Sequence, residues 1–164
     1  MLLILLTVAG CCQDYSPKPD GYLRIDPHPK AYKLIDKTGF PLSFEISQSA
    51  QGIIDNSVAS AWINIIYPRY EATVYCTYIP IDRKNKTRIF AESKELVYRH
   101  GIKAEKIQAQ LYENAERHLY ATLYSLTGNT ATPLQFTVTD SISYLFRGAL
   151  YFDTPVKRDS VAPV

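Results

Sequence analysis

Residues 62–78 read Trp-Ile-Asn-Ile-Ile-Tyr-Pro-Arg-Tyr-Glu-Ala-Thr-Val-Tyr-Cys-Thr-Tyr, and this stretch predicts a β-hairpin. The first strand covers residues 62–67, and Pro68-Arg69 makes the turn. In the second strand, every other residue from Ala72 to Tyr78 faces the core, and the residues between them face away. Cys76 lies on the apolar side, so we expect a buried, inert thiol and not a nucleophile.

The segments before the hairpin are less regular. Leu42, Phe44 and Ile46 alternate with polar residues, which predicts a half-buried strand. Residues 48–60 are predicted to form a polar loop. Further upstream, the sequence Gly-Tyr-Leu-Arg-Ile-Asp at residues 21–26 predicts a first strand, which the Pro-His-Pro sequence at residues 27–29 ends.

One segment after the hairpin has the period of a helix. Between residues 86 and 100 an apolar stripe recurs at helical spacing, and charged residues occupy most other positions. Asn85 can cap the start of this helix, and Gly101 can close its end. The stripe consists of Ile89, Ser93, Leu96, Val97 and His100. We expect this stripe to lie on the sheet.

The second half of the chain is predicted to be rich in strands. Apolar residues alternate over residues 107–111 and 119–123, and strands are also expected at residues 134–138 and 144–152. Turns near Gly128 and Asp140 separate them, which indicates an antiparallel meander. The predicted fold class is α+β: a single antiparallel β-sheet with one main helix, at about residues 86–100, packed on a face.

Composition supports one domain and excludes some function classes. The chain has 164 residues, of which 46% are hydrophobic, enough for one globular domain with a core. Eighteen basic and sixteen acidic side chains nearly balance, so the charge gives no case for nucleic-acid binding. Thirteen tyrosines fit strand propensity, with an aromatic ligand-binding face as the alternative.

The sequence contains no recognisable catalytic or metal-binding constellation. The three histidines, His28, His100 and His118, are far apart in different contexts. No histidine or cysteine pair has the spacing of metal ligands, and no phosphate-binding or nucleophile motif occurs. We therefore expect no enzyme activity, no cofactor and no metal.

The first eleven residues predict a lipoprotein signal. Leu2 to Leu6 form an apolar run too short to span a bilayer, and Val8-Ala9-Gly10-Cys11 matches a lipobox. The Cys11 thiol would take a diacylglyceryl group, and cleavage would follow Gly10. The n-region lacks Lys and Arg, so a misassigned start with ordinary cysteines is the alternative. The expected organisation is a signal peptide at residues 1–10, a lipidated tether at 11–20 and one domain at 21–164.

Three further positions are candidate sites. Arg147, in a strand, is either solvated, paired with an acid, or a contact for a partner. The neighbouring Gly148 marks a bulge or a close backbone approach. Ser141 and Ser160 each lie between an aspartate and an aliphatic residue, a pattern similar to O-glycosylation acceptors of exported proteins. Turn or cap chemistry explains both pairs more simply.

Several ordered segments together resemble the gliding-motility lipoprotein GldD family. These segments are Asp14–Asp26, Ala61–Asn64, Leu96–His100, Leu134–Ser141, Phe146–Phe152 and Asp159–Pro163. The resemblance implies a membrane lipoprotein required for gliding, working with a protein-secretion system of the cell envelope and facing the periplasm. Only the lipid cysteine carries over as a site, onto Cys11. Family members continue past Ser160–Pro163 into a helical tail, so a helix missing after Val164 would leave an apolar patch.

Two function classes follow from these observations. The first is a non-enzymatic, lipid-anchored accessory component of the gliding and secretion machinery, with the membrane and other machinery proteins as partners. The alternative is an envelope lipoprotein that binds carbohydrate or peptide through a tyrosine-rich sheet face. A deep aromatic groove would favour the alternative, and a flat surface would favour the first.

Overall fold

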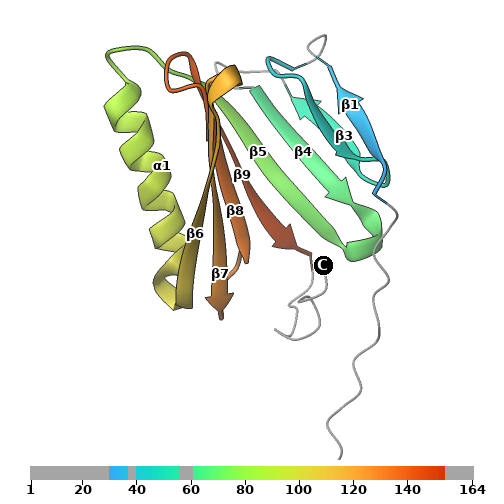
Figure 1. The fold of residues 1–164 in the computed structure, drawn as a ribbon. Coiled ribbons are helices and arrows are strands. Elements are labelled where there is room, and N and C mark those ends of the chain that lie inside the picture. The colour runs from blue at the N-terminus through green and yellow to red at the C-terminus, as the bar shows by residue number, and fades with distance from the viewer. Residues whose placement is uncertain (1–29, 37–39, 56–60, 154–164) are drawn as a thin grey trace, which may run out of the picture.

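The computed structural model describes residues 30–36, 40–55 and 61–153 (Figure 1). The tether and the first strand predicted at residues 21–26 lie outside these ranges. The elements in chain order are β1 (Tyr32–Ile35), β2 (Phe44–Ser47), β3 (Gln51–Asp55), β4 (Ala61–Tyr67), β5 (Ala72–Pro80), α1 (Lys86–His100), β6 (Ala104–Asn114), β7 (Leu119–Gly128), β8 (Leu134–Thr139) and β9 (Tyr144–Phe152).

Seven of these strands form one antiparallel sheet in the order β3-β4-β5-β9-β8-β7-β6. The meander predicted for the second half is confirmed, because β6 to β9 pair in sequence. The last strand, β9, also pairs with β5 and so joins the meander to the predicted hairpin. A second, two-stranded sheet of β1 and β2 adds to the single sheet predicted from the sequence.

The β4–β5 hairpin forms as predicted. Ile63 lies opposite Cys76 in its register, and both side chains are buried. The turn is a short 3₁₀ segment at Pro68–Tyr70, followed by Glu71 with φ of 45°. Proline fits the first position of this turn because its φ is already near the helical value.

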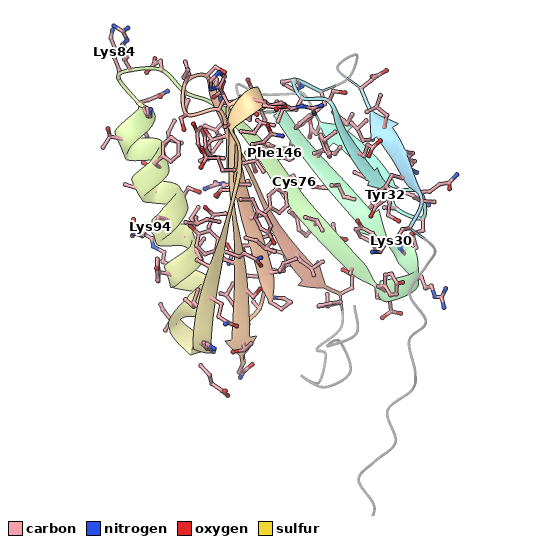
Figure 2. The ribbon with its side chains drawn as sticks, viewed as in Figure 1. Lys30, Tyr32, Cys76, Lys84, Lys94 and Phe146 are labelled. Carbon is pink, nitrogen blue, oxygen red and sulfur yellow. The ribbon has the colours of Figure 1, made fainter. Side chains whose placement is uncertain are left out.

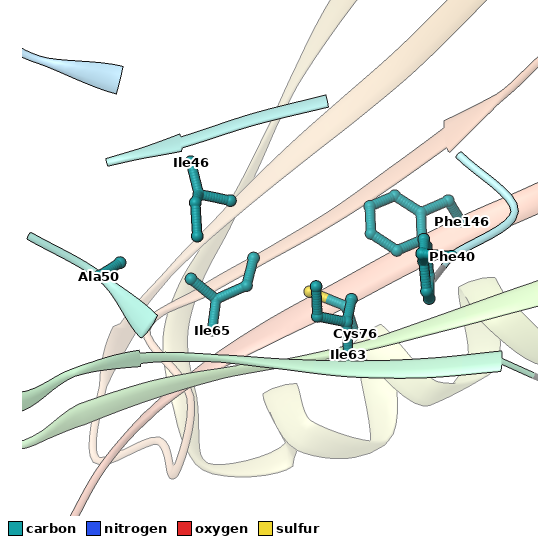
Figure 3. Close-up of a cluster of buried hydrophobic side chains, with 7 residues drawn as sticks. All are labelled: Phe40, Ile46, Ala50, Ile63, Ile65, Cys76 and Phe146. Atoms are coloured by element: carbon teal, nitrogen blue, oxygen red, sulfur yellow. The ribbon is translucent and has the colours of Figure 1, made fainter. Parts of the chain in front are cut away.

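The β1–β2 pair covers one face of the large sheet and encloses the main core. Buried side chains from both layers meet there, as Figure 3 shows: Phe40, Ile46, Ala50, Ile63, Ile65, Cys76 and Phe146. The ring of Phe40 packs edge-on against Phe146, with 5.8 Å between centroids. Figure 2 shows Cys76 and Phe146 in this interior, while Lys94 extends from the outer side of α1.

The helix α1 covers the opposite face, as predicted. Ile89 packs with Ile81 and Leu145 in a smaller core, and Ser93 and Val97 are also buried. Leu96 of the predicted stripe is only half-buried. The two covers are offset: β1–β2 lies over the β3–β5 side of the sheet, and α1 lies over the β6–β9 side (Figure 1). Half of each face is therefore left without a cover among the described residues.

The start of the helix differs from the prediction. Asn85 makes no capping bond to the helix, since its Oδ1 accepts from the Asp82 N–H at 2.8 Å. Asp82 Oδ1 in turn accepts from the N–H groups of Lys84 and Asn85, so the aspartate organises the turn that leads into α1. Gly101 does close the helix, with a right-handed conformation and φ of −80°.

The polar loop predicted at residues 48–60 is wrong over Gln51–Asp55, which form β3. This strand lies at the edge of the sheet and buries little, with Ile53 54% exposed. Its residues therefore do not need the strict alternation that reveals a half-buried strand. β1 was not predicted for the same reason, since most of its side chains are exposed.

Candidate functional site

The two uncovered half-faces and the loop joining β8 to β9 contain the candidate sites. The first half-face borders an open apolar groove of about 410 Å³ between β2 and the large sheet. Its walls are Leu42 to Ile46 on one side and side chains of β4, β5, β7, β8 and β9 on the other. Phe44 and Phe146 meet inside it, with 5.3 Å between ring centroids. The groove offers apolar contact with few polar groups.

The second half-face is rich in aromatic side chains and lies on the other side of β3, β4 and β5. Strand register places Ile53, Trp62 and Tyr75 on this side, and each is at least half exposed. Tyr75 contacts Tyr151 of β9 edge-on, with 5.7 Å between ring centroids. We call Ile53, Trp62, Tyr75 and Tyr151 the aromatic surface. Exposed aromatic side chains of this kind are frequent at protein interfaces.

Arg147 lies between the aromatic surface and α1. It is paired with Thr77 in the register, and Thr77 is paired with Trp62, so the three share one row across the sheet. The side chain is half-buried, and this burial lowers the pKa of the guanidinium, while the nearby carboxylate of Glu92 on α1 opposes the shift. Arg147 therefore lies near the acidic side chain of Glu92 and is itself partly exposed.

The interface between α1 and the sheet is more polar than the main core. Ser93 Oγ and Gln135 Nε2 are buried there and have no hydrogen-bond partner among the described residues. Unpaired buried polar atoms are rare in folded proteins, and each costs free energy.

Cys76 is buried in the main core, as predicted. It is 2% exposed, and its Sγ lies 3.8 Å from the Val74 carbonyl oxygen. Burial raises the pKa of the thiol to about 12, so the thiolate needed for nucleophilic chemistry is not populated at neutral pH. The prediction of an inert thiol agrees with this geometry.

The loop between β8 and β9 contains the Asp140-Ser141 pair and shows its structural role. Asp140 Oδ1 accepts hydrogen bonds from the N–H groups of Ile142, Ser143 and Tyr144, and Oδ2 accepts from Ser143 Oγ. Partial burial opposes ionisation of this carboxyl, but the hydrogen bonds outweigh it and lower its pKa to about 2. Ser141 has φ of 64°, and its carbonyl oxygen accepts from Lys86 Nζ at 2.5 Å. Asp140 is thus used for turn chemistry, as the simpler interpretation predicted.

The other predicted positions are dispersed or outside the described residues. Cys11, Ser160 and His28 lie outside them. His118 is exposed in the turn between β6 and β7, with φ of 49°. Across residues 30–36, 40–55 and 61–153, no three side chains of His, Cys, Asp or Glu gather in a way that could hold a metal ion. No helix in these ranges is long and apolar enough to cross a membrane.

Comparison with known proteins identifies the family. The family model described as gliding motility lipoprotein GldD matches residues 12–164. The chain belongs to the GldD family. No curated protein and no solved structure matches this GldD chain. The predicted resemblance is confirmed over residues 12–164.

Sequence reasoning found Cys76 and Arg147 but not the two half-faces of this GldD protein. The abundance of tyrosine indicated an aromatic face without locating it. Alternation in the second strand of the hairpin predicted that Tyr75 faces away from the core, but no face was predicted for Trp62. The pattern could not predict that each face of the sheet is covered over only half of its strands. This arises because α1 and β1–β2 cover different halves of the sheet.

Proposed function

We propose that this chain is a lipid-anchored, non-enzymatic accessory component of the gliding and associated secretion machinery. The family match over residues 12–164 carries the proposal. The lipobox at Cys11 supplies the anchor, which would hold the domain at an envelope membrane, facing the periplasm. Two acyl chains give stable anchoring, at roughly 0.8 kcal/mol for each buried methylene.

The aromatic surface supports a role in protein binding. Ile53, Trp62 and Tyr75 are exposed on neighbouring strands, and Arg147 lies in the same row of the sheet as Trp62. Tryptophan, tyrosine and arginine are the residues that most often dominate binding energy at interfaces. Its exposed side chains lie on one face of neighbouring strands, which supports a protein partner.

The test is complementation of a deletion strain. We expect deletion to abolish gliding, and the wild-type gene to restore it. Cys11→Ser should fail to restore it and should lose labelling by a fatty-acid analogue, since the anchor is missing. Normal spreading of the deletion strain on agar would contradict the motility role, and equal labelling of both proteins would contradict Cys11 as the lipid site.

A matched pair of variants tests the aromatic surface. Tyr75→Ala should remove partners that co-purify from cross-linked envelopes, because it removes an exposed ring at the centre of the surface. Tyr98→Ala on α1 is the control, since Tyr98 has a similar exposure of 52% but lies on the helix. Equal effects of the two variants would contradict a specific role of this face.

The second candidate function is binding of a carbohydrate or peptide on the same surface. It rests on the ring contact between the exposed Tyr75 and the half-buried Tyr151, together with the exposed Trp62. Trp62 is the chain's one tryptophan, so its fluorescence reports on this surface alone. Saturable quenching by envelope oligosaccharides, abolished in Tyr75→Ala, would favour this function, and a flat titration would exclude those ligands.

O-glycosylation at Ser141 and Ser160 is part of the proposal. Ser141 is partly exposed in a turn where the chain bends sharply, with φ of 64°. Intact-mass analysis of protein from the native envelope tests it. A glycan mass that disappears in Ser141→Ala or Ser160→Ala supports the proposal, and an unmodified mass contradicts it.

A further inference from the structure

The strand β6 leaves one edge of the large sheet open among the described residues. It comes last in the strand order and pairs with β7 alone (Figure 1). Along an edge strand, alternate backbone N–H and C=O groups point away from the sheet and can pair with another chain. The opposite edge strand, β3, has five residues, whereas β6 has eleven. β6 is therefore the longer of the two edges at which a further strand can be added.

The usual protections of a long edge are weak in β6. The register with β7 shifts between Ala104 and Lys106 and is regular along the rest of the strand. Bulges, prolines and lysines commonly protect sheet edges, and none of them occurs in β6 after Lys106. Most side chains of the strand are exposed, with Leu111 79% exposed. A long, regular edge that exposes apolar side chains indicates pairing with another strand.

The sequence of β6 is self-complementary around Ala109. Residues 107–111 read Ile-Gln-Ala-Gln-Leu, so the residue types are similar in either direction. In an antiparallel pair of two such strands with Ala109 opposite itself, Ile107 of one copy lies opposite Leu111 of the other. The two glutamines next to the centre also lie opposite each other. This register therefore matches apolar side chains with apolar side chains and amides with amides.

We propose that a second copy of this chain pairs with β6 in this register, an inference that goes beyond the proposed function and does not depend on it. The two-fold axis is perpendicular to the sheet, so the two large sheets form one continuous sheet with both α1 helices on the same side. The next pair outward is Lys106 with Tyr112, where an ammonium group can lie against a ring. Beyond it, Glu113 lies opposite Glu105, but the bulge at Glu105 interrupts the strand there. The paired stretch therefore ends before the glutamates.

The cover on β6 also fits a second copy. Ile107 lies against Gly101 at the end of α1, since a Cβ on this glycine would be 2.4 Å from Ile107 Cδ1. Leu111 is on the same side of the strand by alternation, but it is left open. Ile102, which is 81% exposed, belongs to the 3₁₀ segment η2 (Gly101–Lys103) at the covered end. The two-fold axis brings the η2 end of each copy beside the open Leu111 end of the other, which removes exposed apolar area from water.

Disulfide trapping tests the register. With Ala109 opposite itself, its two Cα atoms lie about 4.5–5.5 Å apart, a separation that a disulfide spans. Gln110→Cys is the matched control on the same edge. Its two copies are diagonal neighbours about 7–8 Å apart, which is beyond the reach of a disulfide.

The full chain, purified in detergent, is oxidised with diamide, and the disulfide-linked peptides are identified by mass spectrometry. A link between two identical peptides that contain residue 109 can only join two chains. We expect this link in Ala109→Cys and its loss in Gln110→Cys. The unsubstituted chain gives the background from the native cysteines. Absence of the link at position 109, or an equal link at position 110, would overturn the proposal.

Particle mass supplies a second test without added cysteines. We expect light scattering of the full chain in detergent to give the mass of two chains, and about half that mass for Ala109→Lys, because two like charges then face each other. Ala109 is exposed, so the melting temperature of this variant should stay near that of wild type. Ile53→Lys on the opposite edge strand is the matched control and should keep the mass of two chains. A wild-type mass of one chain, or equal masses of the two variants, would overturn the proposal.

Discussion

Gly148 of β9 lies directly opposite Cys76 of β5, and it leaves the space that the ring of Phe136 occupies. A Cβ at this position would lie 2.5 Å from Phe136 Cζ and 3.0 Å from Cys76 Sγ. The sequence left open whether Gly148 marks a bulge or a close approach. The register runs through it without a shift on both sides, so the glycine serves a close approach.

Gly148→Ala should therefore destabilise the domain by about 1–3 kcal/mol, because the added methyl overpacks the core. Gly52→Ala is the matched control on the same face. Its Cβ would meet the flexible end of Ile35 at 3.2 Å, so the variant should cost less. Urea denaturation of both proteins measures the difference, and equal midpoints would contradict the steric argument.

Cys76→Ala should cost on the order of 1 kcal/mol as a small core deletion. The wild-type protein should also lose stability as the pH rises from 9 toward 12, because the unfolded thiol then ionises while the buried thiol keeps its proton. The alanine variant has no thiol to ionise, so the difference in unfolding free energy between wild type and Cys76→Ala should become smaller over that pH range. Rapid labelling of the native thiol at pH 8 would contradict burial.

Asp140→Asn should destabilise the loop between β8 and β9 by on the order of 1 kcal/mol, since three backbone N–H groups lose a charged acceptor. The folded pKa is about 2 and the ordinary value is 3.8. The contribution of the carboxylate is therefore complete above pH 4 and fades as the pH falls toward 2. Thermal melts against pH measure it, with the exposed Asp153→Asn as control. A difference in melting temperature between wild type and Asp140→Asn that does not change with pH would contradict this prediction.

The local elements of this fold could be predicted, but its assembly could not. Alternation identified β2, β5, β6 and β7, and helical spacing identified α1. The edge strand β3 and the exposed β1 bury too little to leave that pattern. The groove is lined by β2, β4, β5, β7, β8 and β9, and within the large sheet β4 and β5 meet β7, β8 and β9 only through the pairing of β5 with β9. No local pattern contains that information.

The helix prediction can be tested on its buried side. Ile89→Ala should cost about 2–5 kcal/mol, because Ile89 is 6% exposed and packs on Ile81 and Leu145. Lys94→Ala, on the outer side of the helix, should change stability by less than about 0.5 kcal/mol. Guanidinium unfolding gives both values. A normal midpoint for Ile89→Ala, together with loss of a partner, would mean that this face is an interface and not a sheet contact.

Substitutions at Arg147 can distinguish a structural role from a role in partner binding. If Arg147 serves mainly to interact with Glu92 of α1, then Arg147→Ala and Glu92→Gln should have similar effects on stability and on assembly. We expect a different result, because Arg147 shares a row with Trp62 on the aromatic surface. Arg147→Ala should lower the yield of co-purified partner about tenfold or more, the size typical of an arginine that contributes strongly to binding.

Glu92→Gln is the matched control for this prediction, and its yield of partner should stay near the wild-type level. Melting temperatures of both variants, measured beside the cross-linked envelopes, separate the two effects. Similar losses of partner yield and of stability in the two variants would show that Arg147 mainly stabilises the position of α1. A loss of yield in Arg147→Ala alone, at an unchanged melting temperature, would assign it to the partner, because only the arginine reaches the exposed row.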